Sequence, residues 1–501
     1  MEVQLRGITK RFATTLANDD IDLTFRSGEI LGLLGENGAG KTTLMNILYG
    51  LYKADAGDIL VDGQLVRFDT PKDAIAAGIG MVHQHFMLVP VFTVAENVVL
   101  GVEPTGVLDS LSIGEAREQV RAISGEYRLE VDPDAVVEEL PVGLQQRVEI
   151  IKILFRSAQL LIFDEPTSVL TPQEVTEFFE VVRALRDAGK AIVFITHKLG
   201  EVIEIADRIQ VLRNGAVVGE RDPATVDDVE LAEMMVGRPV ELVVDKRDAS
   251  PGDILLDTRG LQVLDDRGEV AVDDMNLTVR SGEIVGVAGV QGNGQTELVE
   301  AVAGLRTPAA GRISLLGRDI TGLSPRRRHQ LSMAHVPEDR QRSGIIGTFT
   351  VAENMVLDAY YEERYASGIR LKWDNVNERA AQLVSDFDVR SPSIFTSAES
   401  LSGGNQQKLV VARELSRDVK LIVASQPTRG IDVGSIEYIH KRIVAARDRG
   451  VGALIVSTEL DEIMALADRI LVMYRGRVVA EFEGGAAEVT RIGLAMAGVK
   501  A

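Results

Sequence analysis

A lysine and two threonines at the end of a glycine-rich loop are the residues whose types and spacing most directly suggest chemistry. The loop consists of Gly35, Glu36, Asn37, Gly38, Ala39, Gly40, Lys41, Thr42 and Thr43. Glycines let backbone N–H groups close around phosphate oxygens, and a helix N-terminus adds partial positive charge. In such a loop the lysine reaches the β- and γ-phosphates, and the hydroxyl of Thr42 binds Mg²⁺. The pattern therefore predicts a site for a nucleotide and Mg²⁺.

Two adjacent carboxylates, Asp164 and Glu165, follow the apolar run 160–163. A strand that ends in two carboxylates suits phosphoryl chemistry: Asp164 would hold Mg²⁺, and Glu165 could orient or deprotonate a water molecule. The alternative is a capped strand end without a catalytic role.

Strands and helices must position these groups. Residues 30–34 form an apolar run typical of a buried strand, and the pattern of residues 43–48 predicts the start of a helix. Short apolar runs such as 160–163 are typical of parallel sheets, so each half of the chain is predicted to be α/β. Residues 106–136 and 358–389 are polar and largely helical in pattern, and they predict a helical subdomain in each half.

Composition narrows the function classes. The 501 residues include no cysteine, which excludes disulfides and thiolate metal sites, and the formal net charge of −21 makes nucleic acid a poor partner. No apolar run approaches the ~20 residues that span a bilayer, and the N-terminus shows no apolar signal core. We therefore expect a soluble chain that needs partner subunits for any membrane role.

An internal repeat predicts two tandem domains of one fold. Three segments recur roughly 255 residues later, with three and then four additional residues accumulating between them: 27–30 at 281–284, 92–97 at 349–354 and 206–209 at 467–470. The predicted domains are 1–239 and 253–501. Residues 240–252 are charged and then turn-rich, as expected of a linker.

A second motif indicates the class of protein to which the chain is similar. The segment Leu401-Ser402-Gly403-Gly404-Asn405-Gln406-Gln407 has a first copy at 140–146, where Pro141 replaces the serine. At these residues the chain resembles the ATP-binding cassette (ABC) proteins, with two cassettes in one polypeptide, over essentially its whole length. The resemblance implies two tandem P-loop NTPase domains. Each would have a parallel-sheet core, an antiparallel β subdomain and a helical subdomain.

The resemblance also implies roles for residues that would be unremarkable alone. Phe12 matches the aromatic residue that stacks on adenine, although by itself it would be an ordinary core or surface aromatic. Gln84 matches a glutamine that senses Mg²⁺ and the attacking water, so it joins Thr42 and Asp164 as a metal-site residue. His197 matches the histidine that contacts the γ-phosphate, whereas a lone histidine is more often structural.

The second phosphate loop keeps its glycines but has lost its chemical groups. Gly289, Gly292, Gly294 and Thr296 remain, whereas Gln295 stands in the position of Lys41. The positions of Phe12, Gln84, Asp164, Glu165 and His197 hold, in order, Asp266, Glu338, Ser425, Gln426 and Thr458. We expect no hydrolysis there, because the two carboxylates that would hold Mg²⁺ and activate water are both absent.

The signature motifs show the opposite pattern, because the second is intact and the first is damaged at Pro141. In the resembled family the cassettes pair head-to-tail, and each nucleotide lies between one phosphate loop and the other signature. The intact parts would then form one competent ATP site from the first phosphate loop with Ser402, Gly403, Gly404 and Asn405. The damaged parts would form one degenerate site.

The resemblance implies an ATPase subunit of a membrane importer, using ATP and Mg²⁺ on the cytoplasmic face of the cell membrane. Its partners would be two integral membrane permease subunits and an extracytoplasmic substrate-binding protein. Residues 81–88 and 286–295 look closest to nucleoside importers, and 336–340 is shared with simple-sugar importers, which stay an alternative. A soluble ATPase acting on ribosomes or DNA is disfavoured by the short linker and the acidic charge. A regulatory nucleotide-binding protein without ATP turnover conflicts with the complete set of residues at 35–42, 164–165 and 197.

Three weaker patterns have alternative interpretations. His83 and His85 have a metal-binding spacing, but they could simply flank Gln84 at a joint between subdomains. The apolar stretch 85–92 is either core or a surface that receives a short helix from a membrane subunit. The basic run 325–329 suggests a solvated helix face rather than a nucleic-acid site.

Overall fold

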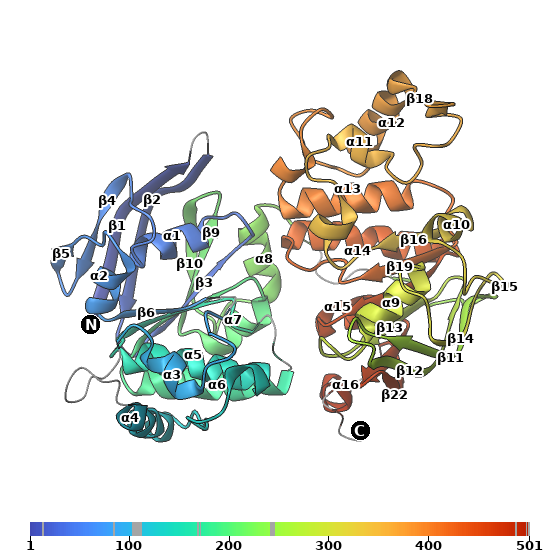
Figure 1. The fold of residues 1–501 in the computed structure, drawn as a ribbon. Helices are drawn as coiled ribbons and strands as arrows, with labels where there is room; N and C mark the ends of the chain where they lie inside the picture. Colours follow the sequence, from blue (N-terminus) through green and yellow to red (C-terminus); the bar gives the residue numbers. More distant parts are fainter. Residues whose placement is uncertain are drawn as a thin grey trace. The chain divides into compact units, whose positions relative to one another are not determined.

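The computed structural model comprises two compact units, Met1–Val240 and Glu241–Ala501. It describes the chain except for residues 13–14, 84–85, 103–112, 168–169, 171, 241–245, 486–487, 497 and 499–501. Figure 1 shows the elements of both units, which are described here one at a time. Within the described part of the chain, no helix is both long and apolar enough to cross a membrane.

The first unit is built on a six-stranded sheet with the order β10-β9-β3-β8-β7-β6. The strands are β3 (Ile30–Gly35), β6 (Ile79–Val82), β7 (Leu160–Asp164), β8 (Ala191–Thr196), β9 (Arg208–Arg213) and β10 (Ala216–Arg221). All neighbours are parallel except β10, which runs antiparallel to β9. Every residue of β3, β7 and β8 is buried, as expected for central strands covered on both faces.

An antiparallel sheet in the same unit has the order β2-β1-β4-β5. Its strands are β1 (Glu2–Phe12), β2 (Thr15–Arg26), β4 (Ala56–Val61) and β5 (Gln64–Val66). Val3, Leu5 and Ile8 of β1 are buried and join a core that includes Leu44 and Met45 of α1. This sheet therefore packs on the helix that begins at the phosphate loop.

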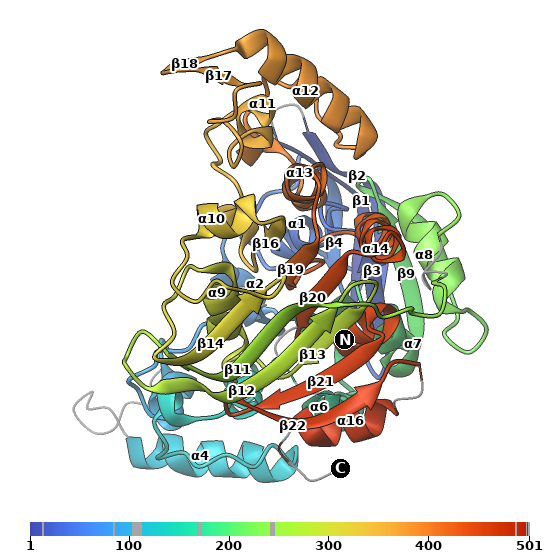
Figure 2. The same cartoon turned by 90° about the vertical axis from the view of Figure 1, so that its right-hand side faces the viewer.

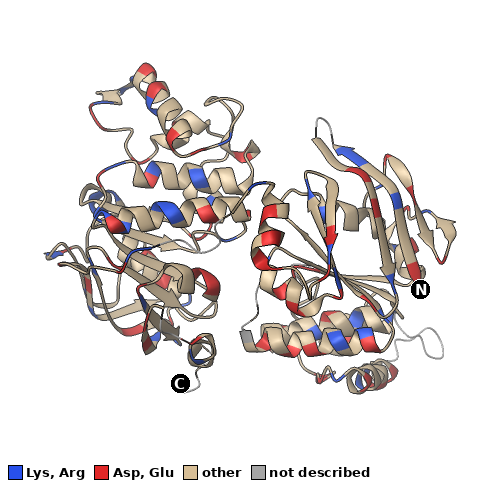
Figure 3. Ribbon diagram, turned by 180° about the vertical axis from the view of Figure 1, so that it is seen from behind, with Lys and Arg blue, Asp and Glu red and all other residues tan. Residues whose placement is uncertain are grey.

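The helices of the first unit cover the parallel sheet and form a separate helical group. They are α1 (Lys41–Leu48), α2 (Pro71–Ala76), α3 (Val94–Val99), α4 (Ile113–Glu126), α5 (Val142–Phe155), α6 (Pro172–Asp187), α7 (Leu199–Ile205) and α8 (Asp228–Val236), with a 3₁₀ turn η2 at Val137–Glu139. Helix α3 contacts both α4 and α5. Thr93 and Glu96 form a capping box that starts α3. Acidic residues gather on α8 (Figure 3).

The two larger sheets of the second unit repeat this topology strand for strand. Its main sheet has the order β16-β19-β20-β13-β21-β22, and its antiparallel sheet has the order β12-β11-β14-β15. The strands are β11 (Ile254–Leu264), β12 (Val270–Arg280), β13 (Ile284–Ala288), β14 (Ala310–Leu315), β15 (Arg318–Asp319), β16 (Met333–Val336), β19 (Leu421–Ser425), β20 (Gly452–Ser457), β21 (Arg469–Tyr474) and β22 (Arg477–Glu483). Figure 2 looks onto these strands, with α16 beside β21 and β22.

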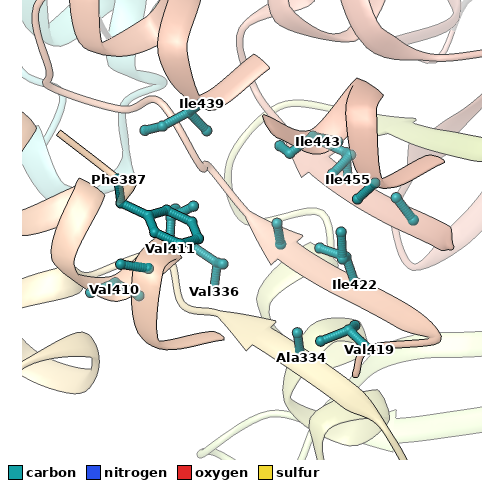
Figure 4. Close-up of a cluster of buried hydrophobic side chains, with 14 of the residues drawn as sticks. Ala334, Val336, Phe387, Val410, Val411, Val419, Ile422, Ile439, Ile443 and Ile455 are labelled. Carbon is teal, nitrogen blue, oxygen red and sulfur yellow. The ribbon is translucent and has the colours of Figure 1, made fainter. Parts of the chain in front are cut away.

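Its helices are α9 (Gln295–Ala303), α10 (Pro325–Gln330), α11 (Val351–Met355), α12 (Trp373–Asp386), α13 (Gly403–Leu415), α14 (Val433–Asp448), α15 (Leu460–Leu466) and α16 (Val489–Met496), with a π-helical turn η3 (Arg340–Gly344) and a 3₁₀ turn η4 (Ala398–Ser400). In the core, Phe387 lies against Val410, Val411 and Val336 (Figure 4). This packing joins the helical group to the sheet. The parallel cores, antiparallel sheets and helical groups confirm the predicted fold class.

The helical expectation for 358–389 is correct only for its second part. Helix α12 starts at Trp373, and the preceding residues contain turns and a small ladder of β17 (Ala366–Ser367) with β18 (Arg370–Leu371). Gly368 supplies the positive φ of 62° that the tight connection between these strands needs.

The later part of the predicted linker, from residue 246 onward, is attached to the second unit. Lys246 donates from Nζ to the carbonyls of Leu466 and Ala467, at 3.1 and 2.7 Å. Arg447 is buried, and both of its terminal nitrogens bind the carbonyl of Arg247 at 2.8 and 2.9 Å. The chain is therefore already held by the second unit at residue 246.

Candidate active site

The first phosphate loop joins β3 to α1 and is shaped by two glycines with positive φ. Gly38 has φ 84° and Gly40 has φ 103°, a conformation that glycine adopts at little cost. A Cβ on Gly40 would lie 2.3 Å from the carbonyl oxygen of Ala17. The buried Asn18 of β2 donates from Nδ2 to the Gly40 carbonyl at 3.0 Å. The antiparallel sheet thus fixes the turn at which α1 begins.

Lys41 lies buried inside this loop. Its Nζ donates to the carbonyls of Gly35 at 2.6 Å and Glu36 at 3.0 Å. Burial lowers the pKa of Lys41, and the nearby carboxylates of Glu165 and Asp164 oppose that shift. Carbonyl oxygens therefore hold the ammonium group at the position from which a loop lysine binds phosphate oxygens.

Asp164 ends β7 as a buried carboxylate. Its pKa is raised to about 6, first by burial and then by the charge of Glu165, while Lys41 opposes the shift. A buried carboxylate of this kind is destabilised as an anion until a cation binds beside it. Thr42 lies in the first turn of α1 and carries a hydroxyl group. This hydroxyl and the Asp164 carboxylate are both oxygen ligands of the kind that Mg²⁺ prefers.

Glu165 and His197 form a hydrogen-bonded pair at the ends of neighbouring strands. Glu165 has φ 48°, and its N–H bonds the Ile195 carbonyl of β8 at 2.9 Å. His197 Nδ1 lies 2.9 Å from Glu165 Oε1. Burial alone would raise the pKa of Glu165, but the hydrogen bond and charge of His197, together with Lys41 and Lys198, lower it. Glu165 is therefore held as a carboxylate, which can accept a proton from water.

Two side-chain hydrogen bonds that were not predicted from the sequence stabilise the segment that follows β7. Gln146 donates from Nε2 to the Pro166 carbonyl at 2.9 Å, and Thr167 donates its hydroxyl to Glu201 at 2.5 Å. Both contacts recur in the second unit, where Gln407 bonds Pro427 at 2.8 Å and Thr428 bonds Glu462 at 2.6 Å. The identity of these residues in both copies of the repeat is the signal that could have revealed them.

Phe12 ends β1 with 40% of its surface exposed. It packs edge-on against Tyr52, with ring centroids 5.4 Å apart, and Lys10 Nζ lies 5.4 Å from its ring centre. Tyr52 is an aromatic residue that the sequence analysis did not select. Gln84, which the family resemblance also assigns to this site, lies outside the described residues.

The second phosphate loop has the same backbone conformation, but the side chain of its own Gln295 forms hydrogen bonds with the loop backbone. Gly292 and Gly294 have φ 88° and 97°, and α9 begins at the buried Gln295. Gln295 donates from Nε2 to the Val290 carbonyl at 2.9 Å, and its Oε1 accepts from the Asn293 N–H at 3.1 Å. A neutral amide thus takes the place of the ammonium group of Lys41.

Neutral groups also replace Asp164, Glu165 and His197 in the second unit. Ser425 is buried, and Gln426 has φ 50° with its N–H bonded to the Val456 carbonyl at 2.7 Å. Gln426 donates from Nε2 to the hydroxyl of Thr458 at 3.1 Å. An amide and a hydroxyl cannot act as a general base near neutral pH, so this copy keeps the geometry of the strand end without its chemistry.

Glu338 is an ionisable residue whose side chain contacts the second phosphate loop. Its carboxylate accepts from the hydroxyl of Thr296 at 3.2 Å and pairs with Arg429 at 2.7 Å. Asp266, by contrast, is highly exposed and pairs with Arg306 at 2.8 Å.

The two signature segments differ at their helix starts. Ser402 caps α13 by accepting from the Asn405 N–H at 3.5 Å and from its Nδ2 at 2.8 Å. Gly403 and Gly404 follow as the first residues of that helix. Pro141 occupies the N-cap of α5 and has no hydroxyl that could cap the helix or bind a phosphate.

Two of the weaker patterns have a structural explanation. Burial lowers the pKa of His83, whose ring lies edge-on to Tyr49, while its partner His85 lies outside the described residues. The basic run at 325–329 is not simply solvated. Arg328 is 1% exposed and its guanidinium binds four backbone carbonyls, and His329 Nε2 lies 2.6 Å from Asp358.

Fold and loop geometry together define a P-loop nucleotide-binding protein with two cassettes of one topology. The family described as "ABC transporter" matches residues 18–168 and 272–429. The chain therefore belongs to the ABC transporter family, which confirms the resemblance. It is accordingly an ATP-binding protein and an ATPase coupled to transport.

Relatives match over nearly the whole chain. The nucleoside import ATP-binding protein NupA of Lactococcus lactis subsp. cremoris is 48% identical, covering 95% of this chain and 94% of that protein. The guanosine import ATP-binding protein NupO of Bacillus subtilis is 46% identical, with 99% and 97% covered. A glucose import ATP-binding protein of Haloferax volcanii is 47% identical, with 99% and 96% covered.

A solved structure matches both cassettes in fold. It is the complex of an archaeal ribosome recycling factor with a ribosomal stalk protein, at a TM-score of 0.62. The match covers 98% of this chain and 92% of that one at 20% identity, so it shows the fold alone.

Proposed function

We propose that the chain is the ATP-hydrolysing subunit of a nucleoside importer with one competent ATP site. The observation that carries this proposal is the contrast between two strand ends of equal geometry. The first ends in a carboxylate held ionised by His197, whereas the second ends in Gln426 bonded to Thr458. Of these two strand ends, only the first carries a side chain that can take a proton from water.

The competent site would combine the first phosphate loop with the signature of the second cassette. Lys41, Asp164, Glu165 and His197 retain their charged or basic side chains, and Ser402 retains the hydroxyl that Pro141 lacks. Head-to-tail pairing within the chain would put all intact groups in one site. It would put Gln295, Glu338, Ser425, Gln426 and Thr458 in the other site with Pro141.

Each group of the competent site has a distinct task in hydrolysis. Lys41 exchanges its two loop carbonyls for phosphate oxygens. Glu165 accepts the proton of the attacking water at a carboxylate oxygen, while His197 keeps that carboxylate ionised and oriented. Phe12 offers its exposed ring for the base. Thr42, Asp164 and Gln84 would hold Mg²⁺, which neutralises phosphate charge when bound.

The partners we propose are two membrane permease subunits and, through them, an extracytoplasmic substrate-binding protein. The chain would then lie on the cytoplasmic face of the cell membrane. Support comes from the relatives, whose names identify them as import ATP-binding proteins. Nucleosides are favoured as solute because NupA and NupO carry that assignment. A sugar importer is the second candidate, since the glucose import relative is almost as similar at 47% identity.

The test is the ATPase activity of the chain purified with its permease subunits. Glu165→Gln should lower turnover by about a hundredfold or more, because it removes the proton acceptor while keeping the shape. Gln426→Ala, its counterpart in the second cassette, should retain most of the turnover. Equal loss in both variants would refute the single-site assignment. Stimulation by guanosine or uridine with the binding protein supports nucleosides, and stimulation by glucose or ribose alone supports the sugar alternative.

A further inference from the structure

The second cassette contains a short insertion beside its signature helix. Ile346 lies eight positions after Glu338, whereas Val89 lies five positions after Gln84. The residues after the insertion correspond, because the N–H groups of Val89 and Ile346 bond the side chains of Asn97 and Asn354 at 2.7 and 2.9 Å. The three additional residues of the second cassette therefore fall within 339–345.

The inserted segment forms the π-helical turn η3 (Arg340–Gly344). Asp339 caps this turn by accepting from the N–H groups of Gln341 at 2.9 Å and Arg342 at 3.0 Å. The turn closes with a bond from the Ile345 N–H to the Arg340 carbonyl at 2.8 Å. Such turns are rare and often occur at functional sites.

Arg340 connects the turn to two other segments of the second cassette. Its Nη1 donates to the Arg429 carbonyl at 2.8 Å, and its Nη2 donates to the Gly430 carbonyl at 3.3 Å. The same Nη2 lies so close to Gly403 that a Cβ there would be 2.5 Å away. The guanidinium is thus fixed between the loop that follows β19 and the first residue of α13.

The C-terminal end of the turn η3 also contacts α13. Arg413, near the end of α13, donates from Nη1 to the Gly344 carbonyl at 2.8 Å, and a Cβ on Gly344 would lie 3.1 Å from Val410. The insertion therefore contacts α13 near both its beginning and its end. The side chain of Arg429, whose carbonyl Arg340 binds, is in turn paired with Glu338.

We infer that Arg340 is a positioning residue for the signature Ser402–Asn405. Its planar fork of donors binds the loop after β19, and the same guanidinium packs against Gly403 at the start of α13, so it would hold the signature in place relative to that loop. The inference rests on the proposed function, in which this signature completes the ATP site of the first cassette. Hydrolysis at Glu165 would then depend on a side chain of the other cassette that is itself not part of the ATP site.

The experiment is a double-mutant cycle on the chain purified with its permease subunits. Arg340→Ala should lower the ATPase turnover number between tenfold and a hundredfold, as for a small displacement of a binding group. Binding of a fluorescent ATP analogue to the Lys41 loop should stay within twofold of wild type. In a Ser402→Ala background, Arg340→Ala should add little further loss, because Arg340 would act only through the signature that the first change has already disabled.

Arg342→Ala is the matched control, because Arg342 lies in the same turn and is exposed. It should keep wild-type turnover. Arg340→Lys keeps the charge without the planar fork, so only partial recovery is expected. If Ser402→Ala does not lower turnover, the proposed pairing of cassettes is wrong. If Ser402→Ala lowers turnover but Arg340→Ala does not, or if the two losses multiply in full, the role of Arg340 is refuted.

Discussion

Replacing Asp164 by Asn should stabilise the nucleotide-free protein although it removes a residue of the proposed active site. Asp164 is buried at the end of β7, and burial together with the charge of Glu165 raises its pKa to about 6 from an ordinary value of 3.8. The folded state therefore binds this proton more tightly than the unfolded state does. Stability contributed by the neutral form is lost as pH rises from about 4 to above 6.

The size of the effect follows from the pKa difference. A shift of roughly two units corresponds to about 3 kcal/mol of unfolding free energy once the carboxylate is ionised in both states. Asn mimics the neutral acid, so Asp164→Asn should recover most of that energy at pH 8 and roughly half of it at pH 5. For a cassette of this size the gain at pH 8 corresponds to roughly 6–12 °C in the midpoint of thermal unfolding.

The assay is thermal unfolding of the full chain in chelator without nucleotide, at pH 5 and pH 8. Asp19→Asn, an exposed carboxylate on β2, is the control and should change the midpoint little at either pH. Adding Mg²⁺ with ATP should raise the midpoint of the wild type more than that of Asp164→Asn. A variant no more stable than wild type at pH 8, or equally stabilised at both pH values, would refute the reasoning.

Three further changes test other parts of the structure. His197→Ala should raise the pKa of Glu165, since burial would act without its main opposing hydrogen bond, and the acidic limb of the pH–rate profile should move to higher pH. Gly40→Ala should weaken nucleotide binding in titrations by at least tenfold, because its Cβ would lie 2.3 Å from a carbonyl oxygen and its φ is 103°. Arg328→Met should lower the unfolding free energy of the second cassette by at least ~2 kcal/mol in denaturant titrations, since four carbonyls lose their buried donor.

Much of the scaffold could be predicted from sequence because its signals are local. A glycine loop between an apolar run and a helix start indicates where Lys41 must lie, and an apolar run that ends in Asp164 and Glu165 indicates a strand end. The repeat then extends both predictions to the second half. These patterns depend only on neighbouring residues and on the periodicity of the strand or helix.

The contacts that set the chemistry could not be predicted, because they join residues far apart in the chain. The ionised state of Glu165 depends on His197 across two strand ends, and the pKa of Asp164 depends on burial. The buried position of Arg328 was also not predictable, since a run of arginines and histidine is typical of a solvated helix face. Its guanidinium instead binds carbonyls around the end of α9.

The positive φ shared by Glu165 and Gln426 has a consequence for protein engineering. Their values of 48° and 50° show that the second cassette keeps a strained turn although its side chain carries no catalytic group. At this turn the two cassettes therefore differ in their side chains and share the backbone conformation. Gln295→Lys, Ser425→Asp and Gln426→Glu would each replace a buried side chain on a main chain that has the conformation of its counterpart in the first cassette. Together with Pro141→Ser, these substitutions would test whether the shared backbone is sufficient for a second competent site.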